Sequence, residues 1–206
     1  MIATALAAVS RLIAGPTVEW LCDPSSEAQR IYFGNHSSHL DFIVIWSALP
    51  PRLRRRTRPV AGRDYWDRGT VRRYVSSRVF RAVLIERGQA AGHNGLVAAR
   101  ESIQRMSDEM GDRDSLIVFP EGTRSPTGEV ATFKSGLFHL SRLRPDAELI
   151  PVHLENLNRV LPKGEALPVP MLSRVVFGPR LEMPAGEDKQ AFLMRARAAL
   201  VELKAV

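Results

Sequence analysis

The stretch GNHSSHLDF, residues 34–42, places two histidines and one aspartate between the apolar runs IYF and FIVIW. His36 and Asp41 have a spacing that does not stack on a regular helix, so a turn is needed to bring the carboxylate to the imidazole. A carboxylate bound to one ring nitrogen fixes the tautomer and raises the basicity of the other nitrogen. An imidazole held in this way can accept a proton near neutral pH. The pair is therefore a candidate general base.

Two other interpretations of this stretch remain open. Ser38 and Asp41 fit the S-x-x-D capping box, in which the aspartate would satisfy a free N–H group at the start of the following helix. His36, His39 and Asp41 could also bind a metal ion, although no further His or Cys cluster in the sequence supports such a site. Outside a metal site, His39 is expected to be an ordinary residue at a helix start.

Two further apolar runs end in positively charged side chains. VLIE precedes Arg87, and LIVF precedes PEGTRS, which contains Gly122 and Arg124. A guanidinium group can bind a phosphate through two parallel hydrogen bonds, and Gly122 permits a tight turn close to a ligand. Lys134 opens a predicted helix whose free N–H groups favour an anion. Each cation alone could be a solvated surface charge, but three at the ends of strands favour an anion site.

The sequence predicts that strands and helices alternate along most of the chain. Strands are expected at 30–35, 58–62, 82–87, 115–119, 148–154 and 174–178, and helices at 41–49, 94–110, 134–143 and 188–204. This alternation predicts an α/β fold with a largely parallel central sheet flanked by helices. In such sheets ligands bind beyond the carboxyl ends of the strands, which is where the polar residues described above fall.

The length of 206 residues fits one domain, expected at 16–206 after a short amphipathic helix at 1–15. One stripe of that helix is apolar, so the helix could pack on the domain or lie in a membrane interface: Ile2, Leu6, Val9 and Ile13. No apolar stretch reaches the ~20 residues needed to cross a bilayer, and no cleaved signal peptide is indicated. Cys22 is the only cysteine, which excludes an internal disulfide and fits a reducing compartment.

The chain is basic, with Lys+Arg 29, Asp+Glu 22 and pI ≈ 10.3. Excess positive charge points to nucleic acid, an anionic membrane or phosphorylated substrates as partners. The run RLRRRTR, residues 52–58, could bind an anionic leaflet, coenzyme A or an acidic carrier protein, or it could be a solvated loop. A non-catalytic basic module that binds anionic membranes or nucleic acid is therefore an alternative. That alternative leaves NHSSHLD and PEGTRS unexplained, and the chain lacks aromatic clusters that stack on single-stranded bases.

NHSSHLD, VLIER and FPEGTRS, in this order, resemble the motifs of the glycerolipid acyltransferases typified by the bacterial lysophosphatidic acid acyltransferases. His36 and Asp41 match the family's His-x4-Asp motif, and Glu86 stands where the second motif has Asp or Glu. FKSG at 133–136 and LIPV at 149–152 continue the resemblance, which covers roughly residues 30–155. One short helix is expected where the family has an N-terminal helical hairpin.

The resemblance implies a glycerol-3-phosphate acyltransferase-like fold and an enzyme of phospholipid biosynthesis. It would transfer a fatty acyl group from acyl-CoA or acyl-carrier protein to the free hydroxyl of a lysophospholipid such as 1-acylglycerol-3-phosphate. His36 would be the general base on that hydroxyl, and Asp41 would orient it, without an acyl-enzyme.

Among the expected binding residues, Arg87 and Arg124 would bind the acceptor's phosphate, and Glu121 would position the acceptor or Arg124. The other residues expected to shape the pocket and its backbone donors are Asn35, Gly122, Thr123, Ser125 and Lys134. No metal or redox cofactor is implied. The expected partners are the lysophospholipid, the acyl donor and a membrane surface, without nucleic acid, at a peripheral position on the cytoplasmic side.

Overall fold

A computed structural model describes residues 15–38, 40–66, 69–86, 93–157 and 173–206. The expected N-terminal helix, His39 and Arg87 lie outside these residues, apart from Gly15 at the end of that helix. Within them, seven strands form one sheet in the order β1-β7-β6-β2-β5-β3-β4. The strands are β1 Thr17–Trp20, β2 Arg30–Gly34, β3 Thr57–Gly62, β4 Val83–Ile85, β5 Ser115–Val118, β6 Glu148–Glu155 and β7 Arg174–Phe177.

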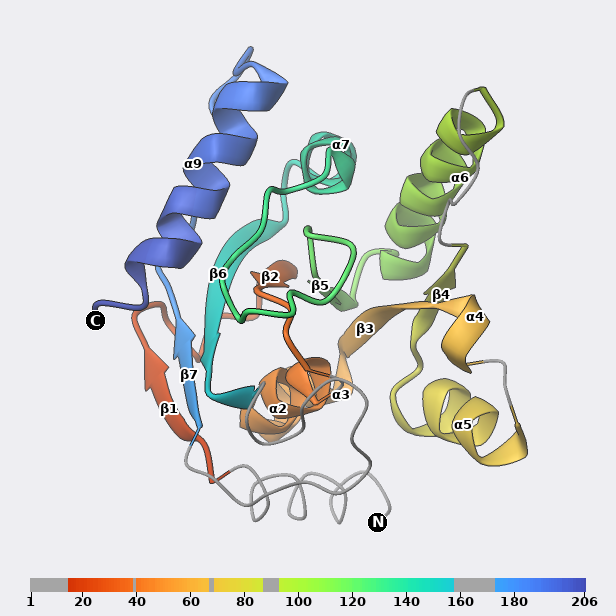
Figure 1. The fold of residues 1–206 in the computed structure, drawn as a ribbon, viewed down its shortest axis with the longest axis horizontal. Helices are drawn as coiled ribbons and strands as arrows, with labels where there is room; N and C mark the ends of the chain where they lie inside the picture. The colour runs from red at the N-terminus through yellow and green to blue at the C-terminus, as the bar shows by residue number, and fades with distance from the viewer. Residues whose placement is uncertain (1–14, 39, 67–68, 87–92, 158–172) are drawn as a thin grey trace.

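The described helices flank this sheet (Figure 1). They are α2 Asp41–Ala48, α3 Pro51–Arg55, α4 Arg63–Trp66, α5 Thr70–Tyr74, the π-helix η1 Val75–Val79, α6 His93–Met110, α7 Gly136–Leu143 and α9 Lys189–Glu202. The helices predicted from periodicity at 41–49, 94–110 and 188–204 are confirmed to within a residue or two at each end. None of the helices in this part of the chain combines the length and apolar character that crossing a bilayer requires.

The sheet is largely parallel, as predicted. β2 pairs in parallel with β5 and β6, and β3 pairs in parallel with β5 and β4. β7 is the exception, because it runs antiparallel to β6 and carries β1 in parallel on its outer side. The carboxyl ends of β2 to β6 therefore lie along one edge of the sheet, called the carboxyl edge below; the opposite edge is the amino edge.

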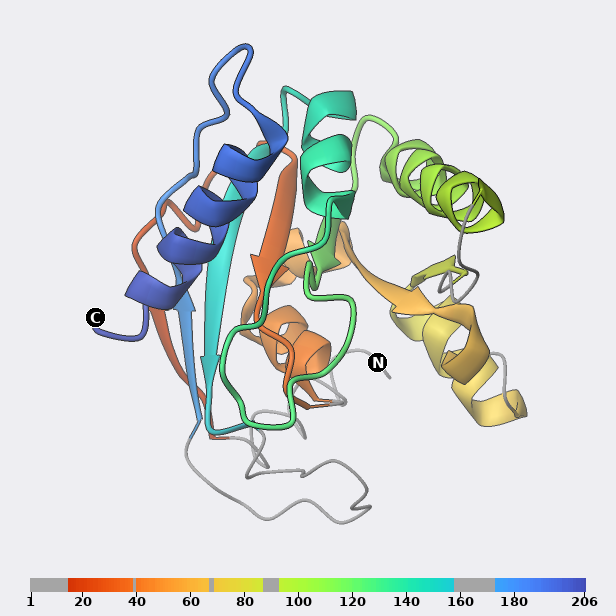
Figure 2. The same cartoon turned by 45° about the horizontal axis from the view of Figure 1, so that its top comes forward.

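Successive residues of the central strands point to opposite faces of the sheet and build two cores. Tyr32 of β2 belongs to a cluster with Ile45 and Leu49 on the side of α2, whereas Ile31 and Phe33 belong to a cluster with residues of α6, α7 and α9. Figure 2 shows α7 and α9 lying across the sheet, with α2 on the other side. With both faces covered, the central strands are nearly continuous apolar runs.

Candidate active site

The turn between β2 and α2 brings His36 and Asp41 together. Asp41 Oδ2 lies 2.8 Å from His36 Nδ1 and also accepts the backbone N–H groups of Ser37 at 2.7 Å and Ser38 at 2.8 Å. The Asp41 side chain is fully buried, whereas that of His36 is 17 % exposed. Because Nδ1 is occupied, Nε2 is the ring nitrogen left to face a ligand. The expected pairing of imidazole and carboxylate is therefore present.

The capping-box interpretation of Ser38 and Asp41 concerns the same Asp41 carboxylate. The bond from the Ser38 N–H to Asp41 is the backbone contact of a capping box, but the Ser38 hydroxyl accepts from Leu40 N at 3.3 Å rather than from the N–H of Asp41. Asp41 thus closes the turn and holds the imidazole at once. Among the described residues, no group of three or more His, Cys, Asp or Glu side chains is arranged to bind a metal ion.

Glu121 supports the backbone of this turn; its expected role in positioning the acceptor or Arg124 stays a prediction. Its Oε1 accepts the backbone N–H of His36 at 2.7 Å, and its Oε2 accepts that of Ala131 at 2.9 Å. The side chain is only 3 % exposed, and this burial raises the pKa of Glu121. Both oxygens are engaged, so the carboxylate ties two loops together.

Asn35, expected to shape the pocket and its backbone donors, bonds to the backbone of β6. Its Nδ2 donates to Leu154 O at 2.9 Å, and its Oδ1 accepts from Leu154 N at 2.8 Å. This side-chain pair continues the β2–β6 ladder beyond Gly34 and Val152. It fixes the chain immediately before His36.

Two further contacts hold His36, and sequence reasoning missed both. The imidazole stacks on the ring of Phe119, with centroids 4.3 Å apart and planes at 17°. The backbone N–H of Ser125 donates to His36 O at 2.7 Å. An aromatic residue at the end of an apolar run gives no local signal of such stacking, because its partner lies in the turn after another strand.

A cavity with a volume of about 340 Å³ opens beside His36, between α6 and α7 and over β3 and β5. Much of its wall is apolar: Val60, Ala61, Ile85, Ile103, Met106, Val118, Leu137 and Leu140. Its polar lining includes His36, Glu86 and Lys134. The candidate base therefore sits where an apolar groove meets a cation.

Of the cations expected to form an anion site, Lys134 lines the cavity beside His36. Gly122 has a φ of +72°, and a Cβ at that position would lie 2.8 Å from Lys134 Nζ, so the ammonium group rests against the glycine backbone. Arg124 is half-buried and does not line the cavity, and its side chain has no hydrogen bond or ion pair with the described residues. Thr123 is exposed and Ser125 is buried.

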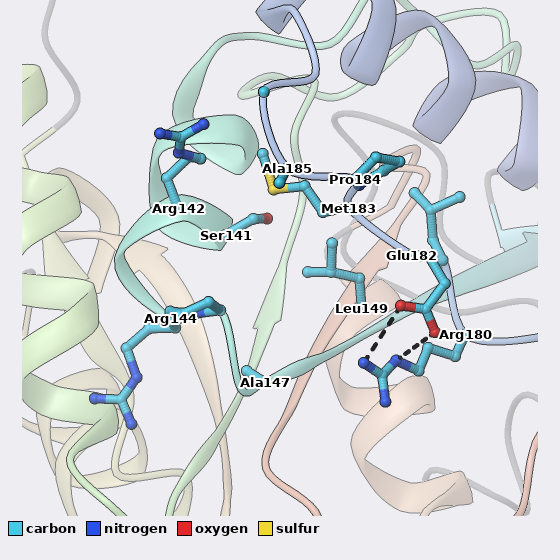
Figure 3. A pocket seen from close by; sticks show the side chains of 13 residues that line it. Ser141, Arg142, Arg144, Ala147, Leu149, Arg180, Glu182, Met183, Pro184 and Ala185 are labelled. Atoms are coloured by element: carbon cyan, nitrogen blue, oxygen red, sulfur yellow. Dashed lines mark hydrogen bonds and ion pairs between the residues drawn. The ribbon is translucent and has the colours of Figure 1, made fainter.

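A second cavity, of about 320 Å³, lies at the opposite end of the strands, where β6 begins. Figure 3 shows Arg142 and Arg144 directed away from its centre and Arg180 paired with Glu182, at 3.0 Å between Nε and Oε1. Arg144 Nη2 instead donates to the side chain of Gln29 at 2.7 Å. None of the candidate site residues lines this cavity.

The arginine run at 52–58 also lies at the amino edge, since it leads into β3. Arg52 pairs with Glu27 at 3.1 Å, Arg56 donates to Ala28 O at 3.0 Å, and Arg58 donates to Arg81 O at 2.6 Å. These guanidinium groups fold onto the protein and hold neighbouring loops, which weakens the case for a basic module built on this run.

Comparisons with known proteins agree with this fold. The acyltransferase family model matches residues 18–155. A 1-acyl-sn-glycerol-3-phosphate acyltransferase of Cocos nucifera is 31% identical over 131 residues, which cover 63% of this chain and 38% of the coconut protein. A protein of the same name from Limnanthes alba is 29% identical over 171 residues, covering 77% of this chain and 56% of its own length. The chain thus spans about half or less of these relatives.

The fold is also that of a solved acyltransferase. The crystal structure of the 1-acyl-sn-glycerophosphate (LPA) acyltransferase PlsC from Thermotoga maritima aligns with a TM-score of 0.69 over 100% of this chain and 80% of that one, at 18% identity. Because the family model matches residues 18–155, more than half of its length, the chain belongs to the acyltransferase family. The resemblance to the glycerolipid acyltransferases and the predicted fold class are confirmed.

Proposed function

We propose that the protein transfers a fatty acyl group from an acyl thioester to the free hydroxyl of a lysophospholipid such as 1-acylglycerol-3-phosphate. The observation that carries the proposal is an imidazole whose Nδ1 is held by a buried carboxylate, 2.8 Å away, beside a largely apolar cavity. The cavity has the lining that an acyl chain requires, and the names of the matched relatives point to the same reaction.

In the proposed mechanism, Nε2 of His36 removes the proton from the acceptor's hydroxyl as its oxygen attacks the thioester carbonyl. The Asp41 carboxylate keeps the proton on Nδ1 and stabilises the imidazolium that forms. The tetrahedral intermediate collapses with cleavage of the carbon–sulfur bond, and the imidazolium returns the proton to the departing thiolate. An ester and a free thiol are the products, and His36 returns to its neutral form because the proton it took from the hydroxyl is passed to the thiolate.

The acceptor's phosphate needs a cation near this base. Lys134 is the described cation that lines the same cavity as His36, and Arg124 follows on the loop after β5. We assign both to the phosphate; Arg87, expected to share this role, lies outside the described residues. Glu121 and Asn35 contribute by holding the backbone around His36 in place.

The test is release of free thiol from an acyl thioester as a function of the acceptor. A panel of lysolipids with different headgroups is crossed with acyl-CoAs of different length and with acyl-carrier protein. The proposal predicts thiol release that requires a lysolipid and is strongest for a phosphate headgroup. Thiol release at the same rate without any lysolipid would identify a thioesterase and overturn it.

A further inference from the structure

Residues 69–79 form a basic arm that leads from the carboxyl edge of the sheet, where α4 follows β3, back to the start of β4. The arm consists of α5 and η1, and its sequence GTVRRYVSSRV contains no acidic residue. Arg72, Arg73 and Arg78 are exposed, and the Tyr74 side chain is 50 % exposed. The exposed side chains of the arm therefore include three arginines and one tyrosine.

The other side of the arm is fixed to the body of the protein. Val75 and Val79 pack against the core on the α2 side of the sheet. Phe80, directly after the arm, is 2 % exposed and lies edge-on to Phe42 and Trp46 of α2, with ring centroids 5.0 Å and 5.1 Å apart. The basic surface is thus held rigidly relative to α2, the helix that Asp41 begins.

The arm follows in the chain shortly after a strand whose end lines the cavity. β3 ends at Gly62, which lines the cavity beside His36, and α4 follows at once. In both views α4 and α5 lie together beyond the end of β3, on the far side of the molecule from α9 (Figures 1 and 2). The arm therefore begins near the end of the sheet that carries the candidate base.

We propose that residues 69–79 dock on a membrane surface that contains anionic lipids. The inference rests on the proposed function in one respect: a lysophospholipid acceptor must be drawn from a lipid surface. Arginines near an anionic leaflet are attracted by its negative potential, and a tyrosine ring is suited to the boundary between headgroups and acyl chains. The absence of acidic residues from this segment leaves nothing in it to repel such a surface.

Flotation of the full chain with vesicles tests the docking surface. Vesicles of phosphatidylcholine alone are compared with vesicles that also contain phosphatidylglycerol. Each arginine near an anionic leaflet contributes about fivefold to binding, so the triple variant Arg72→Gln, Arg73→Gln, Arg78→Gln should bind the anionic vesicles about a hundredfold more weakly.

The matched control removes the same charge elsewhere. Arg55, Arg105 and Arg113 are also exposed; Arg55 and Arg113 precede β3 and β5 at the amino edge, and Arg105 lies on α6. The variant Arg55→Gln, Arg105→Gln, Arg113→Gln should lose less than about fivefold, since its net charge is equal but its arginines lie elsewhere. Equal losses in the two triple variants would overturn the proposal, and so would tighter, arm-dependent binding to a DNA duplex than to the anionic vesicles.

Activity measurements separate this inference from the proposed function. With a short-chain lysophosphatidate dissolved as monomers, the arm variant should turn over like the unaltered protein, whereas on anionic vesicles its rate should fall with its binding. If the unaltered protein shows no turnover on either substrate but still floats in an arm-dependent way, the proposed function fails and the docking surface stands.

Discussion

The backbone N–H of His36 donates to Glu121 Oε1 at 2.7 Å, across 85 positions of sequence. The other oxygen of the same carboxylate holds Ala131, on the loop that leads to α7. One buried side chain therefore sets the position of the candidate base relative to the loop that forms part of the cavity wall.

Replacing Glu121 should disturb this arrangement without touching the acceptor. In Glu121→Gln one acceptor oxygen becomes an amide donor, which leaves either the His36 or the Ala131 N–H without a partner. Losing such a buried bond costs about 1–3 kcal/mol in the free energy of unfolding. Urea denaturation measures this loss, and steady-state kinetics should show a lower kcat with the acceptor's KM nearly unchanged. A higher KM at unchanged kcat would instead indicate direct contact with the acceptor.

Asp41→Asn should reduce turnover far more than it reduces substrate binding. The amide cannot stabilise the imidazolium that His36 becomes, and it favours the wrong tautomer. We expect kcat to fall about 10²–10⁴-fold, while the KM for the acyl donor changes little. Circular dichroism checks that the variant is folded, because Asp41 also accepts the N–H groups of Ser37 and Ser38. Near-normal kcat in a folded variant would remove Asp41 from the mechanism.

Gly122→Ala tests the position of Lys134. The added Cβ would lie 2.8 Å from Lys134 Nζ, at a φ of +72°, so the ammonium group must move away from its present place. The left-handed backbone alone costs about 1–2 kcal/mol. Gly186→Ala is the matched control, because its φ of +77° carries similar strain but its Cβ would meet nothing within 4 Å.

Only the substitution at 122 should raise the acceptor's KM, whereas both glycine variants should lower the stability by a similar amount. Kinetics with a lysophosphatidate and thermal unfolding of the same preparations give the two quantities. Equal KM values in the two variants would separate Lys134 from acceptor binding.

The free energy of unfolding should fall in mild acid because of His153. This side chain is 5 % exposed on β6, and burial lowers its pKa below the ordinary value of 6.5, with Lys204 and Arg174 acting in the same direction and Glu155 opposing them. The unfolded chain therefore binds a proton at a higher pH than the folded protein. Stability is fully present above about pH 6.5 and decreases as the pH falls toward the folded-state pKa.

Urea denaturation between about pH 7.5 and pH 5 measures this decrease. His153→Gln should flatten the pH dependence, because the group that must be protonated is gone. His139→Gln, on the exposed side of α7, is the control and should leave the slope as it is. An unchanged slope in His153→Gln would assign the acid sensitivity to other groups.

Local patterns predicted most of the elements that surround the site. Alternating apolar runs and helical periodicity gave the strands and helices of the central sheet, and the parallel crossovers placed His36 and the PEGTRS loop at one edge. Strand direction is not encoded locally, so the antiparallel β7 could not be predicted from RVVFG. Leu96 continues the apolar stripe of α6 but is 66 % exposed, because the stripe extends beyond the core.

The contacts around His36 could be predicted only in part. Its partner Asp41 lies within one turn, and the turn's composition indicated the pairing. The partners of Glu121 and Asn35 are backbone groups of other strands and loops, which tertiary packing sets and local sequence does not indicate. The arginines at 52–58 had the composition of a solvated run, yet their donors find carbonyl groups that only the folded chain brings near.

The most direct measurement compares His36→Ala with His139→Ala in lysolipid-dependent release of thiol from an acyl-CoA, on preparations with matching circular dichroism. His139 lies exposed on α7, away from the Asp41 carboxylate. Loss of the lysolipid-dependent rate in the first variant and an unchanged rate in the second is the predicted result. A His36→Ala variant that keeps most of its rate would contradict the assignment of the imidazole as the base.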